Sequence, residues 1–128
     1  MKKVIILAAA LLLNVAAQAG PYPEITIDQL KSAIAAKEVT LLDVNGSQSW
    51  KQGHIPGALD YASSQANLAK VLPKNKDALI VAYCGGPSCG AYARAAKAAK
   101  DLGYTNVKHL TAGISGWKSA GEKTASSS

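Results

Sequence analysis

The hydrophobic pattern of the first nineteen residues differs from that of the remaining chain. Two lysines precede an unbroken run of ten apolar residues, 4–13, and Ala17-Gln18-Ala19 follows. This order is typical of a secretory signal peptide cleaved after Ala19. Because a membrane-spanning helix needs about 20 apolar residues, we expect residues 1–19 to be removed and no membrane anchor to remain. We therefore predict an exported protein of a bacterial periplasm.

The first half of the exported chain shows a helical pattern followed by a strand pattern. Thr26 and Gln29 have the spacing of a capping box, and a short amphipathic helix follows them. The apolar run 39–44 is too short for a helix and rich in β-formers, so it predicts a buried parallel strand with Asp43 at its C-terminal end. Three glycines and a proline indicate that residues 45–57 form a long connection rather than an element.

The second half of the chain continues this alternation. A brief strand at residues 58–61 precedes a helix that Ser63 or Ser64 caps and Pro73 ends. The inner face of that helix carries three apolar residues at helical spacing, Leu68, Val71 and Leu72. The later elements are, in chain order, a buried strand at 78–83, an Ala-rich helix at 91–102 closed by Gly103, a strand at 107–110 and a short helix containing Trp117.

This order of elements predicts an α/β fold with a small, largely parallel sheet flanked by helices on both faces. Right-handed crossovers place the loops that follow the strands at one edge of the sheet, where ligands usually bind. Asp43 and Cys84 both end strands at that edge. We expect residues 20–121 to form one domain and residues 122–128, which are mostly small and polar, to be a disordered tail.

Charge argues against nucleic-acid binding, and cysteine content argues against a small domain that depends on disulfides. Removal of the two signal-peptide lysines lowers the formal net charge from +6 to +4. The remaining lysines are spread along the chain, with no run of four and no interleaved aromatic residues, which argues against nucleic-acid binding. Two cysteines cannot form the framework of a small domain that depends on disulfides.

The candidate chemistry is concentrated at Cys84. A thiol that follows a buried strand and precedes a glycine-rich loop and a helix faces backbone N–H groups and the positive end of the helix dipole. That environment stabilises a thiolate and any anion bound to it. Gly85 and Gly86 let the backbone curl around the sulfur. A buried cysteine that only packs is the alternative, and the Gly-Gly-Pro sequence that follows favours a functional one.

Cys89 lies five residues after Cys84, and an exported protein meets an oxidising compartment. This spacing permits a disulfide between the two. We consider three roles for Cys89: a structural staple of the loop, a redox partner that resolves an intermediate on Cys84, or a bystander at the start of the helix. We favour the bystander and the resolving role, because a permanent staple would remove the thiol that the loop presents.

Four sequence blocks resemble the rhodanese-like sulfurtransferases, and the similarity covers residues 25–117. The blocks are, in the family's order, Leu41-Leu42-Asp43-Val44, Gly53-His54-Ile55-Pro56-Gly57-Ala58, Val81-Ala82-Tyr83-Cys84, and Leu102-Gly103-Tyr104-Thr105-Asn106-Val107 leading to Leu110, Gly113 and Trp117. The chain is most similar to the small exported subgroup whose active loop begins Cys-Gly-Gly-Pro. The resemblance implies a single rhodanese domain in which Cys84 takes sulfur from a donor as a persulfide and passes it to a thiophilic acceptor.

The same resemblance implies the other site residues. The donor is expected to be thiosulfate or a persulfide or polysulfide, and the acceptor a thiol. Asp43 and His54 are expected to be structural, with the His54 imidazole bonded to backbone atoms. No metal or other cofactor is expected. The residues expected to hold a small sulfur-containing anion are Gly85, Gly86, Pro87, Ser88, Cys89, Gly90 and Arg94.

Several residues depart from the family's pattern. Asn45 and Ser49 stand where the family has an arginine and an acidic residue, so we expect neutral contacts in place of a structural ion pair. The active loop lacks its usual arginine and is longer ahead of Ala95 and Ala96. Arg94 near the helix start either substitutes for that arginine or is an ordinary surface residue. We therefore expect thiosulfate to be a poor donor.

A binding module and a redox protein are alternative functions that involve the same residues, whereas phosphatase activity and zinc binding are disfavoured. A non-catalytic binding module would keep the fold with a changed loop, and a thiol–disulfide redox protein would use Cys84 and Cys89. A related phosphatase needs an arginine six residues after its cysteine to clamp phosphate, and Gly90 stands there. The two cysteines, His54 and His109 lack the paired spacing of zinc ligands.

Overall fold

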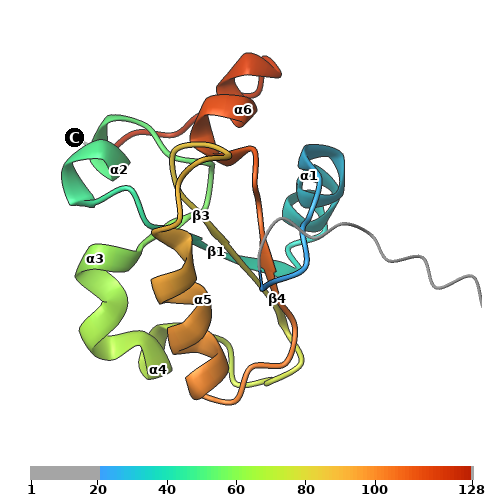
Figure 1. The fold of residues 1–128 in the computed structure, drawn as a ribbon, viewed down its shortest axis with the longest axis vertical. Helices are drawn as coiled ribbons and strands as arrows, with labels where there is room; N and C mark the ends of the chain where they lie inside the picture. The colour runs from blue at the N-terminus through green and yellow to red at the C-terminus, as the bar shows by residue number, and fades with distance from the viewer. Residues whose placement is uncertain (1–20, 128) are drawn as a thin grey trace, which may run out of the picture.

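A parallel sheet forms the centre of the computed structural model, which describes residues 21–127 (Figure 1). The predicted signal peptide, residues 1–19, lies outside that range. The strand order is β2-β1-β3-β4, and every pair is parallel. The strands are β1 (Val39–Asp43), β2 (Leu59–Asp60), β3 (Leu79–Tyr83) and β4 (Val107–His109). The predicted α/β fold with a small parallel sheet is therefore confirmed.

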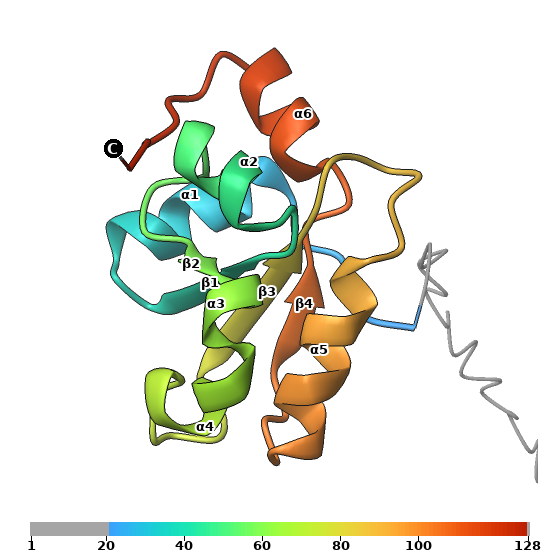
Figure 2. The ribbon, with the colours of Figure 1, turned by 90° about the vertical axis from the view of Figure 1, so that its left-hand side faces the viewer.

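Helices cover both faces of the sheet, as predicted (Figure 2). They are α1 (Ile27–Ala35), α2 (Ser47–Gln52), α3 (Tyr61–Ser64), the 3₁₀ helix η1 (Gln65–Asn67), α4 (Leu68–Val71), α5 (Tyr92–Asp101) and α6 (Gly113–Ser119). None of the helices within residues 21–127 is long and apolar enough to cross a membrane.

The side chains of β3 alternate between two cores, which decides the direction in which Cys84 points. Val81 and Tyr83 pack in the core that α1 and α6 cover. Ile80 and Ala82 pack in the other core, against α4 and α5. Successive residues of a strand face opposite sides, and Cys84 joins the second core. The alternation therefore directs the cysteine toward α5.

Local sequence signals fix the ends of two helices where we predicted them. Thr26 Oγ1 accepts the N–H of Gln29 at 3.1 Å, and Gln29 Oε1 accepts the N–H of Thr26 at 3.0 Å, which completes the capping box of α1. Gly103 follows α5 with φ of +97°, a left-handed conformation that glycine adopts without steric cost.

Residues 45–57 do not form the continuous connection that the sequence predicted, because α2 lies within them. This helix has no buried residue and no side-chain cap at its N-terminus, so its sequence carries no amphipathic or capping signal. Contacts with neighbouring residues hold it instead. The Trp50 indole N–H donates to the Ala58 carbonyl oxygen at 2.8 Å, and the His54 ring stacks on Trp50 with centroids 4.2 Å apart.

The helix predicted to start at Ser63 or Ser64 begins earlier and is broken. Asp60 caps it, because Asp60 Oδ1 accepts the N–H of Ala62 at 3.1 Å, and this places Tyr61 in α3 rather than in the brief strand. The segment then changes to η1 and α4. The change in helical pitch turns Val71 outward, where it is 43% exposed, so its predicted place on the inner face is wrong.

Residues 122–127 lie against the domain, which differs from the disordered tail that their composition predicts. Ala125 and His54 form an antiparallel bridge, with N–H to carbonyl oxygen distances of 2.8 and 2.9 Å. The Trp117 indole N–H donates to the carbonyl oxygen of Lys123 at 2.8 Å. Backbone atoms of residues 122–127 make these contacts, so the small polar side chains carry no signal of them.

The hydroxyl of Tyr83 links β3 to two other segments inside the protein. It donates to Asp43 Oδ2 at 2.7 Å and accepts the N–H of Ile55 at 3.0 Å. Burial and the neighbouring Asp43 carboxylate raise the pKa of Tyr83, so this hydroxyl keeps its proton at a pH where an exposed tyrosine ionises.

We expect Tyr83→Phe to lower the free energy of unfolding by about 1–3 kcal/mol, because it leaves a buried carboxylate oxygen and a buried N–H without a partner. Urea denaturation of both proteins measures the difference. Tyr61→Phe is the matched control, since Tyr61 is partly exposed and its hydroxyl makes no hydrogen bond within the described residues. An equal midpoint for Tyr83→Phe and Tyr61→Phe would contradict the prediction.

Candidate functional site

The candidate site is the loop between β3 and α5 at the C-terminal edge of the sheet. Cys84 is the first residue after β3 and is 1% exposed. The carbonyl oxygens of Cys84 and Gly85 accept the N–H groups of Ile114 and Ser115, each at 2.9 Å. These N–H groups belong to the first turn of α6, where they have no partner within the helix. The start of the loop is therefore held by backbone contacts with α6.

Gly113 makes this close approach possible. Its φ is +61°, and a Cβ built on it would lie 2.6 Å from the Cys84 carbonyl oxygen, the Gly85 carbonyl carbon and the Gly86 nitrogen. Real Cβ atoms do not approach backbone atoms so closely. Glycine is thus required here both by the backbone conformation and by the space that the loop occupies.

Cys84 and Cys89 are joined by a disulfide. Their Cα atoms are 6.2 Å apart, and the N–H of Cys89 donates to the Gly86 carbonyl oxygen at 3.1 Å, which closes a turn that brings Cys89 back to Cys84. The interpretation of Cys89 as a bystander is therefore wrong. Both remaining interpretations, the staple and the redox pair, use this bond. Cys89 is partly exposed whereas Cys84 is buried.

The rest of the loop leaves backbone donors free. The N–H groups of Gly85, Gly86, Ser88 and Gly90 have no hydrogen-bond partner within residues 21–127. Pro87 has no N–H group, and α5 begins two residues after Gly90. Free N–H groups followed by a helix N-terminus favour negative charge in the loop. The structure thus leaves four N–H donors of the loop without partners in its described part, and anion binding by residues 85–90 stays a prediction.

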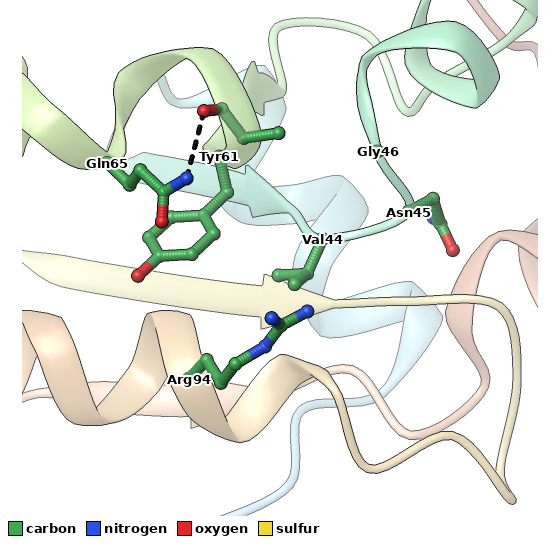
Figure 3. Close-up of a pocket in the computed structure, with 7 residues that line it drawn as sticks. Val44, Asn45, Gly46, Tyr61, Gln65 and Arg94 are labelled. Carbon is green, nitrogen blue, oxygen red and sulfur yellow. Dashed lines mark hydrogen bonds between the residues drawn. The ribbon is translucent and has the colours of Figure 1, made fainter.

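Arg94 lines a pocket of about 220 Å³ beside this loop (Figure 3). Val44 also lines this pocket. Val44 is the first residue after β1, and Cys84 is the first residue after β3, the strand that pairs with β1. Both side chains belong to the same core cluster. The other lining residues are Asn45, Gly46, Tyr61, Ala62 and Gln65. Neither cysteine lines the pocket. Arg94 is exposed and makes no ion pair within the described residues, so its charge is available to a ligand.

A second pocket, of about 250 Å³, lies between α2 and α6. Asn45 and Ser49, two residues that depart from the family's pattern, line it together with Lys118. Asn45 lines both pockets, and its Oδ1 lies 3.8 Å from the place that a Cβ of Gly85 would take. Asn45 and Ser49, for which we predicted neutral contacts in place of the family's ion pair, thus line one pocket, and Lys118 adds a cation that the sequence analysis did not identify.

Asp43 and His54 position segments and line neither pocket. Asp43 is fully buried, and its Oδ1 accepts the N–H of Asn45 at 2.8 Å, so it fixes the end of β1. His54 Nδ1 lies 2.6 Å from the Trp50 carbonyl oxygen. No group of three or more His, Cys, Asp or Glu side chains able to hold a metal occurs within residues 21–127.

A family model, the Rhodanese-like domain, matches residues 26–120. The chain belongs to the rhodanese-like family. Its sequence is 37% identical over 103 residues to an HTH-type transcriptional regulator of Mycobacterium tuberculosis. That match covers 80% of this chain and 44% of the regulator, so the rhodanese-like chain spans less than half the length of this relative.

Two sulfurtransferases are also similar to this rhodanese-like chain. The thiosulfate sulfurtransferase GlpE of Pseudoalteromonas translucida is 28% identical, over 77% of this chain and 91% of its own length. The crystal structure of a thiosulfate sulfurtransferase from Pseudomonas aeruginosa matches with a TM-score of 0.69 and 28% identity, covering 82% of this chain and 20% of that one. At this low identity, the family and these relatives support a sulfurtransferase kind of function.

His109 is a buried polar residue near the site of the rhodanese-like domain, and the sequence analysis did not place it there. His109 ends β4 beside Ala82 and is 2% exposed. Its ring stacks on Tyr92 at the start of α5, with centroids 3.3 Å apart, and its Nε2 has no partner in the described part of the chain. Burial lowers the pKa of His109, against the opposing effect of Glu24. The available signal was the position of an ionisable residue, His109, within the strand predicted at 107–110.

The contact at Gly113 predicts that a single methyl group displaces the active loop. We expect Gly113→Ala to lower the free energy of unfolding by about 2–4 kcal/mol, from the left-handed φ and the overlap with three backbone atoms. Gly121→Ala is the matched control, because Gly121 also has positive φ, +78°, but has no atom within 4 Å of its added Cβ. Thermal denaturation compares the two. A smaller loss for Gly113→Ala than for Gly121→Ala would contradict the prediction.

Proposed function

We propose that this protein is a sulfurtransferase that moves sulfane sulfur from a donor to a thiophilic acceptor through a persulfide on Cys84. The observation that carries the proposal is the placement of Cys84, at the end of a central parallel strand and at the start of a loop with free N–H groups. Membership of the rhodanese-like family and similarity to thiosulfate sulfurtransferases support it.

The reaction has two displacement steps. The Cys84 thiolate attacks the sulfane sulfur of the donor, the bond between that sulfur and the rest of the donor breaks, and the donor fragment leaves; from thiosulfate it leaves as sulfite. An acceptor thiolate then attacks the outer sulfur of the persulfide and restores the Cys84 thiolate. Free N–H groups of residues 85–90 stabilise the negative charge of both states without a metal or other cofactor.

The disulfide form has no free nucleophile, so sulfur transfer starts from the reduced protein. A thiol reductant opens the bond between Cys84 and Cys89 and yields two thiols. We further propose that the protein is exported to the bacterial periplasm. An oxidising compartment agrees with a disulfide that closes the site between turnovers.

A thiol–disulfide redox protein is the second candidate, and the disulfide itself favours it. In that function Cys84 and Cys89 exchange electrons with another dithiol and no sulfur atom is bound. Intact mass of the Cys89→Ser variant separates the two functions, because a persulfide adds one sulfur atom to Cys84, whereas a variant with one cysteine cannot form the internal disulfide of a redox pair.

We expect Cys84→Ser to abolish sulfur uptake, because serine cannot attack sulfane sulfur to form a persulfide. The reduced protein is incubated with thiosulfate, or with glutathione persulfide, and its intact mass is recorded before and after addition of cyanide. Cys89→Ser is the matched control: it retains Cys84 as its single cysteine, and it gains one sulfur atom that cyanide removes. Full uptake by Cys84→Ser would make the proposed nucleophile wrong.

Arg94 is expected to assist an anionic donor. Arg94→Gln should raise KM for thiosulfate by roughly three- to tenfold, which corresponds to an ion pair of about 1 kcal/mol at an exposed site. Lys97→Gln removes the same charge from α5 at a residue that pairs with Asp101 instead. Steady-state rates of thiocyanate formation, with thiosulfate varied, measure the effect. Equal KM values for Arg94→Gln and Lys97→Gln would identify Arg94 as an ordinary surface residue.

A further inference from the structure

The two cysteines of the disulfide are held in different ways. Cys84 is buried, and α6 fixes its carbonyl group and that of Gly85. Cys89 is partly exposed and lies on the outer part of the loop, where its N–H contacts only the Gly86 carbonyl oxygen. Cys84 is therefore fixed against α6, whereas Cys89 lies on a loop of small residues that brings its sulfur to Cys84.

We propose that Cys89 is a resolving thiol, which attacks the inner sulfur of a persulfide on Cys84, expels hydrosulfide and forms the disulfide of the structure. This inference rests on the proposed function, because it needs the persulfide. It adds an activity to sulfur transfer: the reduction of sulfane sulfur to hydrosulfide without any acceptor bound at the site.

The step balances in atoms and electrons. A bond forms between Cys89 Sγ and Cys84 Sγ, and the bond between Cys84 Sγ and the outer sulfur breaks. The outer sulfur leaves with that electron pair and the proton of the Cys89 thiol, as hydrosulfide. The sulfane sulfur gains two electrons, and the two cysteines supply them in passing from dithiol to disulfide.

Geometry favours the inner sulfur as the point of attack. The Cα atoms are 6.2 Å apart, within the usual range for disulfides, and the structure places Cys89 Sγ in bonding contact with Cys84 Sγ. In a persulfide that same atom is the inner sulfur. Attack at the outer sulfur would need Cys89 to withdraw by about the length of one S–S bond, roughly 2 Å. The turn closed by Gly86 holds Cys89 at the shorter distance.

The difference in exposure between the two cysteines also decides which sulfur an external thiol attacks when the disulfide is reduced. In the disulfide form, an external thiolate meets Cys89, which is partly exposed, before Cys84, which is buried. Its attack leaves a mixed disulfide on Cys89 and releases Cys84 as a thiolate beside the free N–H groups of the loop. A second thiol of the same reductant then frees Cys89, so the partner chemistry is that of a dithiol. Each cycle converts one sulfane sulfur and one dithiol into hydrosulfide and a disulfide.

A single-turnover experiment tests the resolving step. The protein and its Cys89→Ser variant are reduced with dithiothreitol, freed of reductant under anaerobic conditions, and given one equivalent of thiosulfate, or of glutathione persulfide in a second series. Hydrosulfide is measured with a sulfide electrode, and intact mass is recorded without reduction. The wild type should release close to one equivalent of hydrosulfide and end two hydrogens lighter than the dithiol. Cys89→Ser should keep the added sulfur and release at least tenfold less.

The possible results separate this inference from the proposed function. A persulfide that persists in the wild type, or equal hydrosulfide release from Cys89→Ser, overturns the resolving role and leaves the sulfurtransferase intact. Absence of sulfur uptake by Cys89→Ser from both donors overturns the proposed function and the resolving role together.

A trapping experiment tests the direction of reopening. The oxidised protein is treated briefly with 2-mercaptoethanol, a monothiol that does not complete the reduction rapidly, and free thiols are then alkylated with iodoacetamide. Peptide mapping should find the mercaptoethanol adduct on Cys89 and the alkyl group on Cys84. The reverse assignment would contradict an opening that starts at Cys89.

Discussion

The backbone contact between the end of β3 and the start of α6 determines the geometry of the site. Two carbonyl groups, of Cys84 and Gly85, accept the N–H groups of Ile114 and Ser115. Those N–H groups would otherwise lack partners at the helix N-terminus, so the contact completes α6 and anchors the loop at once. In a trans peptide the N–H points opposite to the carbonyl group, so the N–H groups of Gly85 and Gly86 point away from α6, and neither has a partner within residues 21–127.

A buried polar cluster supports the same edge of the sheet beneath α1 and α6. Tyr83 and Asp43 are paired in register on β3 and β1, and the hydroxyl of Tyr83 reaches both the Asp43 carboxylate and the N–H of Ile55. The carboxylate keeps two hydrogen bonds although it is fully buried, which offsets the cost of removing it from water. The strand ends that carry Val44 and Cys84 are thus held in a fixed relation.

The sequence predicted the parts of the fold whose signals are local. The apolar runs that became β1 and β3, the capping box at Thr26 and the helix end at Gly103 each depend on neighbours in sequence. It did not predict α2 or the outward turn of Val71, because contacts such as that of Trp50 with Ala58 decide them. In the same way, residue spacing permitted a bond between Cys84 and Cys89 but could not show that the turn at Gly86 closes it.

The proposed function assigns charge stabilisation to the backbone N–H groups of the loop, so that one loop serves both proposed steps. Backbone N–H groups do not titrate and do not depend on a particular substrate, so under this proposal they favour the Cys84 thiolate, its persulfide and the thiolate released from a disulfide alike. The same proposal leaves selection among donors to side chains on either side of the loop. Arg94 lines one pocket and Lys118 the other, and Asn45 lies between them without charge. On the proposed function, the absence of the loop arginine thus assigns donor recognition to Arg94 and Lys118, outside the loop, while the backbone N–H groups activate Cys84.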